Sequence, residues 1–285
     1  MLSSVNLWKE RFDRKRMKRI FLHIILIVGA IVFLYPFLWM VTASLSPESE
    51  ITKLTFLPST FTITGYQQMV EKIPIFRAFI NSLLVSLSIT AGVLIFGSMV
   101  GYALSRLRFR GRNLIFFIII FTMTLPFQIT LIPQYIIMVK LGWVDNYLGL
   151  IVPYLMNAFG IIMFRQYFMS LPQDLIDAAR IDGCSEARIL FGVLWPNSIP
   201  ALVTVGIITF MASWNEVLWP LIVIRNENLM TMPQLVTLFV VGGRAESQLG
   251  VKLASATILA VPIIIAYMFF QRYFIQSMAT TGMKE

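Results

Sequence analysis

The hydrophobic positions of this chain gather in six long runs that contain no Asp, Glu, Lys or Arg. A bilayer core needs about 20 apolar residues of helix, so each run can cross a membrane once, and none can hold two crossings with a turn. The pattern therefore predicts an all-α integral membrane protein with six transmembrane helices. The predicted spans cover residues 20–41, 78–105, 113–139, 146–168, 199–222 and 253–272.

The segments between these spans divide into short and long connections. A basic arm, residues 1–19, precedes a single six-span domain that covers residues 20–285. One long polar connection inside that domain is the loop 169–198, between the fourth and fifth spans. The other two long connections, 48–77 and 225–252, lie on the opposite side of the membrane, because each follows an odd number of spans.

The distribution of basic residues predicts which side is which. Of the 23 Lys and Arg residues, 16 lie on the side of the two termini and the loop 169–198, including four in the short connection 106–112, and 7 lie on the opposite side. Lys and Arg are enriched in the cytoplasmic segments of membrane proteins, so both termini and the loop are predicted to be cytoplasmic. The basic arm is not read as a signal peptide, because the run that follows is too long and lacks a small-residue cleavage site.

Composition excludes several function classes. With 58% hydrophobic and 13% charged residues, the chain is too apolar for an ordinary soluble domain. The basic residues form no face with interleaved aromatics, which argues against nucleic acid as a partner. One cysteine, Cys184, and one histidine, His23, allow no intrachain disulfide and no His-rich metal site. No phosphate-binding loop or hydrolase motif occurs, so the chain is not expected to be an enzyme.

The loop 169–198 carries local signals for two short helices. Ser170 and Gln173 have the spacing of a capping box, and Pro172 suits a first helical turn. Gly183 stands where a left-handed residue would close the first helix. A second helix is predicted to begin at Ser185 and to end before Pro196.

The same loop resembles the EAA loop of ATP-binding cassette importer permeases, which reads Glu-Ala-Ala-x3-Gly-x9-Ile-x-Leu-Pro. Here Asp177 replaces the Glu and keeps its charge, and Trp195 replaces the Leu. The run Asp-Ala-Ala-Arg-Ile-Asp-Gly resembles the carbohydrate-uptake branch, and the short N-terminal arm resembles the smaller, maltose-type second permease. In the family this loop forms the coupling helix, which sits in a cleft of the ATPase subunit. The residues that match or adjoin the motif are Asp177, Ala178, Ala179, Asp182, Gly183 and Pro196.

The resemblance implies an assembly in a prokaryotic plasma membrane. Its expected partners are a second permease, two cytoplasmic ATPase subunits that bind ATP and Mg²⁺, and an extracytoplasmic solute-binding protein. This chain itself is expected to bind no cofactor or metal. By position, the outer loop 226–250 would contact the binding protein and the tail 279–285 would contact the ATPases. Ala178 and Ala179 would be small because the helix lies deep in a partner's cleft.

Polar side chains inside apolar spans are candidates for a substrate path, because they are costly unless they face a cavity or a partner. Amides and carboxylates bind sugar hydroxyls, and aromatic rings pack on the C–H face of a sugar ring. An alternative interpretation is interhelical hydrogen bonding and aromatic anchoring at the membrane interface. The candidates are Gln128, Gln134, Trp214, Asn215 and Glu216, with Trp39, Asn81, Asn157 and Trp219 as further ones.

The expected function is that of a permease subunit in an ATP-driven, binding-protein-dependent importer of a sugar or oligosaccharide, working by alternating access. One alternative is a permease of the same superfamily for glycerol phosphate or another polar solute. A phosphate substrate would favour several basic residues in the path, and no span has one in its middle. An ion-coupled secondary transporter is a further alternative, which intramembrane carboxylates and inverted repeats would indicate.

Overall fold

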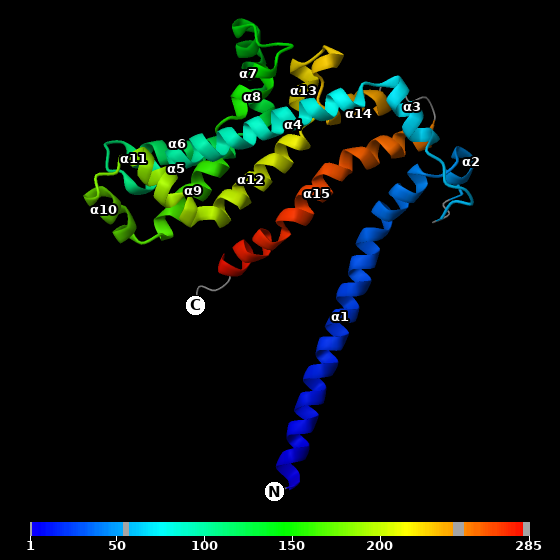
Figure 1. Ribbon diagram of the computed structural model, residues 1–285, viewed down its shortest axis with the longest axis horizontal. Helices are drawn as coiled ribbons and strands as arrows, with labels where there is room; N and C mark the ends of the chain where they lie inside the picture. Colours follow the sequence, from blue (N-terminus) through cyan, green and yellow to red (C-terminus); the bar gives the residue numbers. More distant parts are fainter. Residues whose placement is uncertain (1, 54–56, 242–247, 282–285) are drawn as a thin grey trace. The chain divides into compact units, whose positions relative to one another are not determined.

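The computed structural model describes residues 2–53, 57–241 and 248–281. All regular elements in these ranges are helical (Figure 1). Residues 242–247 of the predicted outer loop and 282–285 of the predicted ATPase-contacting tail lie outside them. The chain divides into two compact units: residues 1–69 with 245–257, and residues 70–244 with 258–285.

The first unit contains the long helix α1 (Leu2–Ser44), the short α2 (Glu48–Ile51), most of α3 (Thr64–Lys72) and the start of α15 (Leu249–Thr281). The carboxylate of Glu48 accepts backbone N–H bonds from Leu249 at 2.6 Å and Gly250 at 2.9 Å. It therefore caps the first turn of α15, whose free N–H groups favour an anion. This contact attaches the segment after α1 to the start of the last predicted span.

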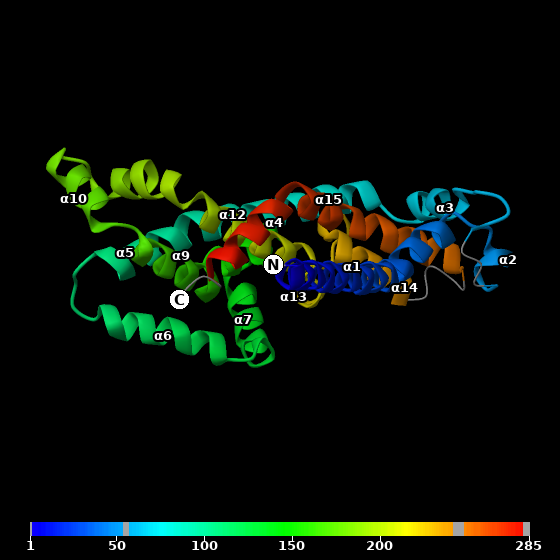
Figure 2. The ribbon, with the colours of Figure 1, turned by 90° about the horizontal axis from the view of Figure 1, so that it is seen from below.

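The second unit is built on a continuous 32-residue helix, Ile75–Arg106. It comprises α4 (Ile75–Gly92), the π-helical turn η1 (Val93–Gly97) and α5 (Ser98–Arg106). Helix α9 (Ala158–Ser170) packs along α5, and α12 (Ile199–Trp214) packs along α4 (Figures 1 and 2). Gly101 allows the close approach of α5 and α9, because a Cβ there would lie 2.7 Å from the Cβ of Phe164. A Cβ at Gly97 would meet only ordinary 3.7 Å contacts.

The predicted third span is sharply bent. Helices α6 (Arg112–Thr124) and α7 (Phe127–Leu141) meet at 104° (Figure 2). Pro126 stands at the break, where its ring excludes a helical residue before it and its missing N–H removes a helical bond. Pro133, by contrast, lies inside α7 without ending it.

Two other predicted spans are interrupted near one end. The fourth begins as α8 (Tyr147–Ile151) and η2 (Val152–Tyr154), and Asn157 then caps α9. The fifth stops at Trp214, and a separate helix α13 (Leu218–Val223) follows. The remaining elements are α10 (Gln173–Ile181), α11 (Glu186–Arg188), η3 (Ile189–Leu194), η4 (Pro196–Ser198), η5 (Glu227–Leu229) and α14 (Met232–Val241).

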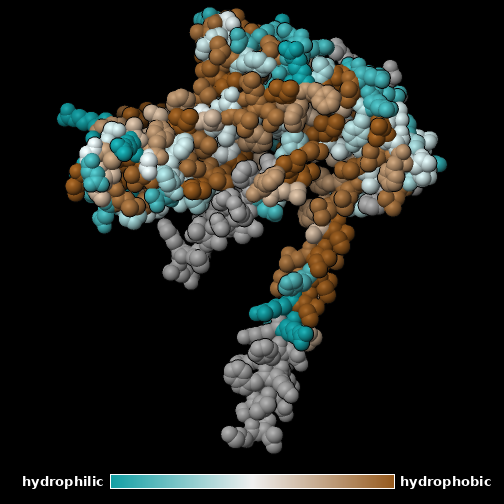
Figure 3. Space-filling view, in the orientation of Figure 1, coloured by the Kyte–Doolittle hydropathy of each residue, from teal (hydrophilic) through white to brown (hydrophobic). Residues whose placement is uncertain are grey.

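The chain is a multi-pass membrane protein by the length and composition of its helices. Among the described residues, five helices are long and apolar enough to cross a bilayer, and the bent α6–α7 pair makes up to six. Large apolar side chains on these helices are exposed: Phe33 is 78% exposed and Phe117 is 66% exposed. Figure 3 shows hydrophobic side chains along α1 and over the middle of the second unit. A lipid environment accounts for such surfaces.

Candidate functional site

The loop 169–198 forms a short helix with a well-defined end. Helix α10 covers Gln173–Ile181, and Gly183 follows with φ +74°. The N–H of Cys184 bonds to Ala179 O at 3.0 Å, and the N–H of Gly183 bonds to Arg180 O at 3.0 Å. These two bonds make a Schellman motif, so the left-handed role predicted for Gly183 is confirmed. Ser185 then caps the next helix by accepting the N–H of Arg188, as predicted.

The capping box predicted for Ser170 and Gln173 was wrong. Ser170 is the last residue of α9, and its hydroxyl donates to Tyr167 O at 2.7 Å. The residue before α10 is Pro172, which has no side-chain donor or acceptor. Gln173 instead turns its side chain to other partners.

The two faces of α10 differ in exposure. Ile176 and Ala179 are buried against the chain's own residues, with Ala179 only 7% exposed. The opposite face presents Asp174, Ala178 and, at the end of the helix, Ile181. The Ile181 side chain is 87% exposed. Of the two alanines singled out by the sequence, Ala178 alone is therefore available to another molecule, and Ile181 is an apolar contact that the sequence reading missed.

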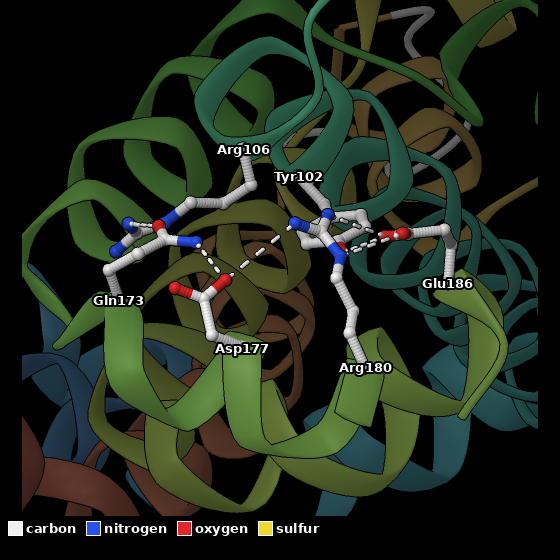
Figure 4. A network of polar contacts seen from close by, with 6 residues as sticks. All are labelled: Tyr102, Arg106, Gln173, Asp177, Arg180 and Glu186. Carbon is white, nitrogen blue, oxygen red and sulfur yellow. Dashed lines mark hydrogen bonds and ion pairs between the residues drawn. The ribbon is translucent and has the colours of Figure 1, made fainter. Parts of the chain in front are cut away.

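A ring of polar contacts encloses one side of α10 (Figure 4). It begins at Arg106 of α5, whose Nη1 donates to Gln173 Oε1 at 2.6 Å. Gln173 Nε2 then donates to Asp177 Oδ1 at 3.0 Å. An ion pair at 3.9 Å joins Asp177 to Arg180.

The ring closes on the same helix where it began. Arg180 Nε donates to Glu186 Oε1 at 3.1 Å, and the hydroxyl of Tyr102, also on α5, donates to Glu186. Helix α10 and the start of α11 are thus held to α5 at both ends of one network. Asp177, the residue at the Glu position of the motif, belongs to this network and is still 54% exposed.

Arg106 also fixes the connection between α9 and α10. Its Nε and Nη2 donate to Phe168 O at 3.1 and 2.5 Å, and Nη2 also donates to Leu171 O. The guanidinium therefore binds carbonyls at the end of α9 while it holds Gln173. A planar fork with five donors can make these bonds together, whereas a lysine ammonium lacks that geometry.

The far end of the loop has its own contact with α5. The indole Nε1 of Trp195 donates to Ser98 Oγ at 3.0 Å, and its ring packs edge-on against Phe191 at 5.0 Å. Trp195 is the residue that departs from the Leu of the family pattern, and a Leu could not make this bond. Pro196 begins η4 and is exposed, as is Asp182.

The contacts in the ring favour the charged forms of Glu186 and Arg180. Hydrogen bonds from Tyr102 and Arg180 hold the pKa of the Glu186 carboxyl below its usual range. The same bond with Glu186 raises the pKa of Arg180. A pocket of about 710 Å³ opens beside the ring. Its lining is mostly basic and polar: Ser105, Arg106, Leu107, Arg108, Arg112, Gln173, Asp177 and Arg180.

A separate cavity of about 150 Å³ lies among α4, α8, α12 and α13. Its lining includes Glu216, Asn157 and Trp219, all singled out by the sequence. Glu216 lies past the end of α12, and its carboxylate accepts the N–H of Trp219 at 3.0 Å. Thr209 and Thr231 also line the cavity; each is 5% exposed, and neither hydroxyl has a hydrogen-bond partner among the described residues.

The other path candidates lie outside that cavity. Trp214 is buried between Phe79 and Phe210, and its indole Nε1 donates to Leu259 O at 3.4 Å. Asn215 is exposed and donates to Met211 O. Gln128 is exposed and Gln134 half-buried, both on α7. The structure therefore brings only Glu216 of the five principal candidates to the cavity.

Two further candidates have structural partners instead. Asn81 donates to Asn228 O and Met230 O, both at 2.9 Å, and accepts from Tyr147 Oη at 2.7 Å. It therefore anchors the segment before α14. Trp39 is half-buried near the end of α1.

Comparison with known proteins shows to which family this multi-pass membrane protein belongs. Residues 93–280 match the family "Binding-protein-dependent transport system inner membrane component". The chain belongs to that family. It is thus a membrane permease component of a binding-protein-dependent importer, and not itself an enzyme. This membership leaves the ion-coupled secondary transporter without support.

Several relatives are similar over nearly the whole chain. The arabinooligosaccharides transport system permease protein AraQ of Halalkalibacterium halodurans is 36% identical over 261 residues, covering 90% of this chain and 92% of the relative. The sn-glycerol-3-phosphate transport system permease protein UgpE of Salmonella typhimurium is 31% identical over 274 residues, covering 93% of this chain and 98% of the relative. A solved bacterial ABC transporter involved in the import of the acidic polysaccharide alginate has a chain with TM-score 0.79 and 28% identity, covering 91% and 97%.

Proposed function

We propose that this chain is one of two permease subunits of a carbohydrate importer and that α10 is its coupling helix. The observation that carries the proposal is the exposed face of α10. Ala178 and the 87% exposed Ile181 project from a helix whose other face is fixed to its own chain. An apolar side chain with that exposure on a rigid helix is typical of an interface anchor that fills a partner's pocket.

The proposed partner of this face is a cytoplasmic ATPase subunit. The residue pattern Asp177-Ala178-Ala179 with Gly183 supports this, as does the excess of Lys and Arg on the side of the loop 169–198. Both termini then lie in the cytoplasm. ATP and Mg²⁺ would be bound by two ATPase subunits, a second permease would complete the path, and an extracytoplasmic binding protein would deliver the substrate. This chain would hold no cofactor.

The proposed substrate is an uncharged sugar or oligosaccharide. The cavity is lined by two buried threonine hydroxyls that have no partner in the described part of the chain, by the amide of Asn157 and by the carboxylate of Glu216. Hydroxyl groups of a sugar would satisfy all of them. No Lys or Arg is among the described residues that line this cavity, so a phosphate would meet an uncompensated carboxylate. The similarity to AraQ supports a neutral oligosaccharide, and the similarity to UgpE is what keeps glycerol phosphate as the alternative.

The coupling role can be tested by the substitution Ile181→Asp in the complete transporter, purified in detergent through a tag on this chain. A buried interface anchor replaced by a carboxylate should reduce the recovered ATPase roughly tenfold or more. The matched control is Ile63→Asp, which makes the same change at a 58% exposed isoleucine before α3. Equal ATPase recovery from both variants, with normal uptake, would show that α10 does not dock the ATPase.

A further inference from the structure

Three polar side chains form a stripe on α5. Ser98, Tyr102 and Arg106 are spaced four residues apart, so they lie on one face of the helix at successive turns. Ser98 is fully buried and Tyr102 is 3% exposed. Each member of this regular polar stripe has a partner in the loop 169–198.

The partners follow the order of the loop. Arg106 binds its start, at Leu171 O and Gln173 Oε1. Tyr102 binds its middle, at the carboxylate of Glu186. Ser98 binds its end, at the indole N–H of Trp195. One contact would let the loop pivot on α5, whereas three contacts at different heights fix both its position and its rotation.

The rest of α5 is also closely packed. Gly101 lies on α9 so closely that a Cβ would meet Arg165 N at 3.0 Å as well as Phe164. The ring of Tyr102 packs edge-on against Phe168 at 6.5 Å. Helix α5, the end of α9 and the loop therefore have few ways to move separately.

Helices α4 and α5 form one continuous helix. Val85 and Ile89 of α4 line the cavity that contains Glu216 and Thr209. About 17 residues separate Ile89 from Arg106, or roughly 25 Å of helix. A displacement applied to the loop at one end is thus carried by a single helix to the wall of the cavity at the other.

We propose that Ser98, Tyr102 and Arg106 are positioning residues that transmit movement of α10 to the α4–α5 helix, and so link ATP hydrolysis to the cavity. The proposal rests on the function proposed above. It differs from a purely stabilising role in one measurable respect. Weakening one of these three contacts should leave the ATPase bound and active while less substrate is moved for each ATP hydrolysed.

The test compares two tyrosines that each lose a hydroxyl. Tyr102→Phe removes the bond from α5 to Glu186, whereas Tyr167→Phe removes a 3.5 Å bond from α9 to Asn197 O in the same loop. Complete transporter in proteoliposomes, with its binding protein and an arabinooligosaccharide as the probe, gives uptake and ATP hydrolysis together. Tyr102→Phe should lower uptake per ATP roughly tenfold, the effect of losing one hydrogen bond to a charged group. Tyr167→Phe should leave that ratio unchanged.

The second contact is tested by a double-mutant cycle of Ser98→Ala and Trp195→Phe. If the bond between the Trp195 indole and the Ser98 hydroxyl transmits this movement, the two single variants and the double variant should lower uptake per ATP equally. Unchanged uptake per ATP in Tyr102→Phe and in both members of the cycle would overturn the proposal, even if thermal stability fell. These variants keep the exposed face of α10. If they leave uptake per ATP unchanged, loss of ATPase binding by Ile181→Asp would therefore still support the coupling role.

Discussion

Gly101 on α5 faces Phe164 on α9 so closely that a methyl group at Gly101 would lie 2.7 Å from the Phe164 Cβ. Small residues at helix crossings let membrane helices approach, since lipid supplies little driving force for their association. This contact sets the distance between the helix that carries the polar stripe and the helix that leads into α10.

Gly101→Ala should therefore destabilise the protein by about 1–3 kcal/mol, as overpacking does. Gly97→Ala is the control, because a Cβ there meets its nearest atoms at 3.7 Å. Thermal unfolding of the purified transporter in detergent should show a lower midpoint for Gly101→Ala alone. Equal midpoints for the two variants would mean that α5 and α9 are not as close as described.

The end of α10 depends on backbone conformation rather than on space. Gly183 has φ +74° and open space around the position of a Cβ. Gly183→Val should thus cost about 1–2 kcal/mol from the left-handed backbone alone, while Gly183→Asn should be better tolerated because Asn adopts this conformation more readily. ATPase recovery should follow the order glycine, asparagine, valine. Recovery that is the same for asparagine and valine would argue against a conformational role.

The ring of polar contacts around α10 should become less stable at acidic pH. The pKa of Glu186 is lowered in the folded protein, so its contribution is fully present above the unfolded pKa of about 4.3 and is lost as pH falls through the folded value. Hydrogen exchange of residues 173–188 should therefore accelerate below pH 4, after correction for the intrinsic rate. Glu186→Gln should show faster exchange at pH 7 and less dependence on acid. Parallel pH profiles for the two proteins would contradict this.

The cavity predicts selection against anionic substrates. On the proposed function, the complete transporter should take up a neutral oligosaccharide and should not take up sn-glycerol 3-phosphate. Thr209→Val should reduce sugar uptake with little change in shape, because it removes a buried hydroxyl that has no partner among the described residues. Glu216→Gln should reduce the discrimination against phosphate. Uptake of glycerol phosphate by the wild-type protein would favour the alternative substrate class.

Local sequence patterns predicted the elements that depend on neighbouring residues. Apolar runs longer than a bilayer is thick predicted six spans, of which five, or six with the bent pair, are found among the described residues. Gly183 predicted the end of α10, and Ser185 predicted the start of the next helix. The capping box failed because Pro172 and the preceding helix left Ser170 inside α9, where its hydroxyl bonds back to Tyr167 O. The Oε1 of Gln173 accepts from Arg106, a side chain distant in sequence, instead of from a local backbone N–H.

Contacts between distant residues were beyond the sequence reading. The spacing of Ser98, Tyr102 and Arg106 is visible as a polar stripe with a period of four, but its partners are about 70 to 100 residues away, so only the packing of α5 on α9 identifies them. Glu216 was found because a carboxylate near a span is rare. Thr209 was missed because a threonine in a helix usually bonds to its own backbone, and Thr231 was missed because it lies just before α14, outside the predicted spans.

The coupling role proposed for α10 requires its exposed face to lie against an ATPase subunit. Photo-crosslinking tests it most directly: a benzoylphenylalanine placed at Ile181 in the complete transporter is compared with one at Ile63, and adducts are identified by mass spectrometry. Both side chains are exposed, at 87% and 58%, so both can accept the probe without repacking. An adduct with the ATPase is expected from position 181 and none from position 63. An ATPase adduct from position 63, or its absence from position 181, would contradict it.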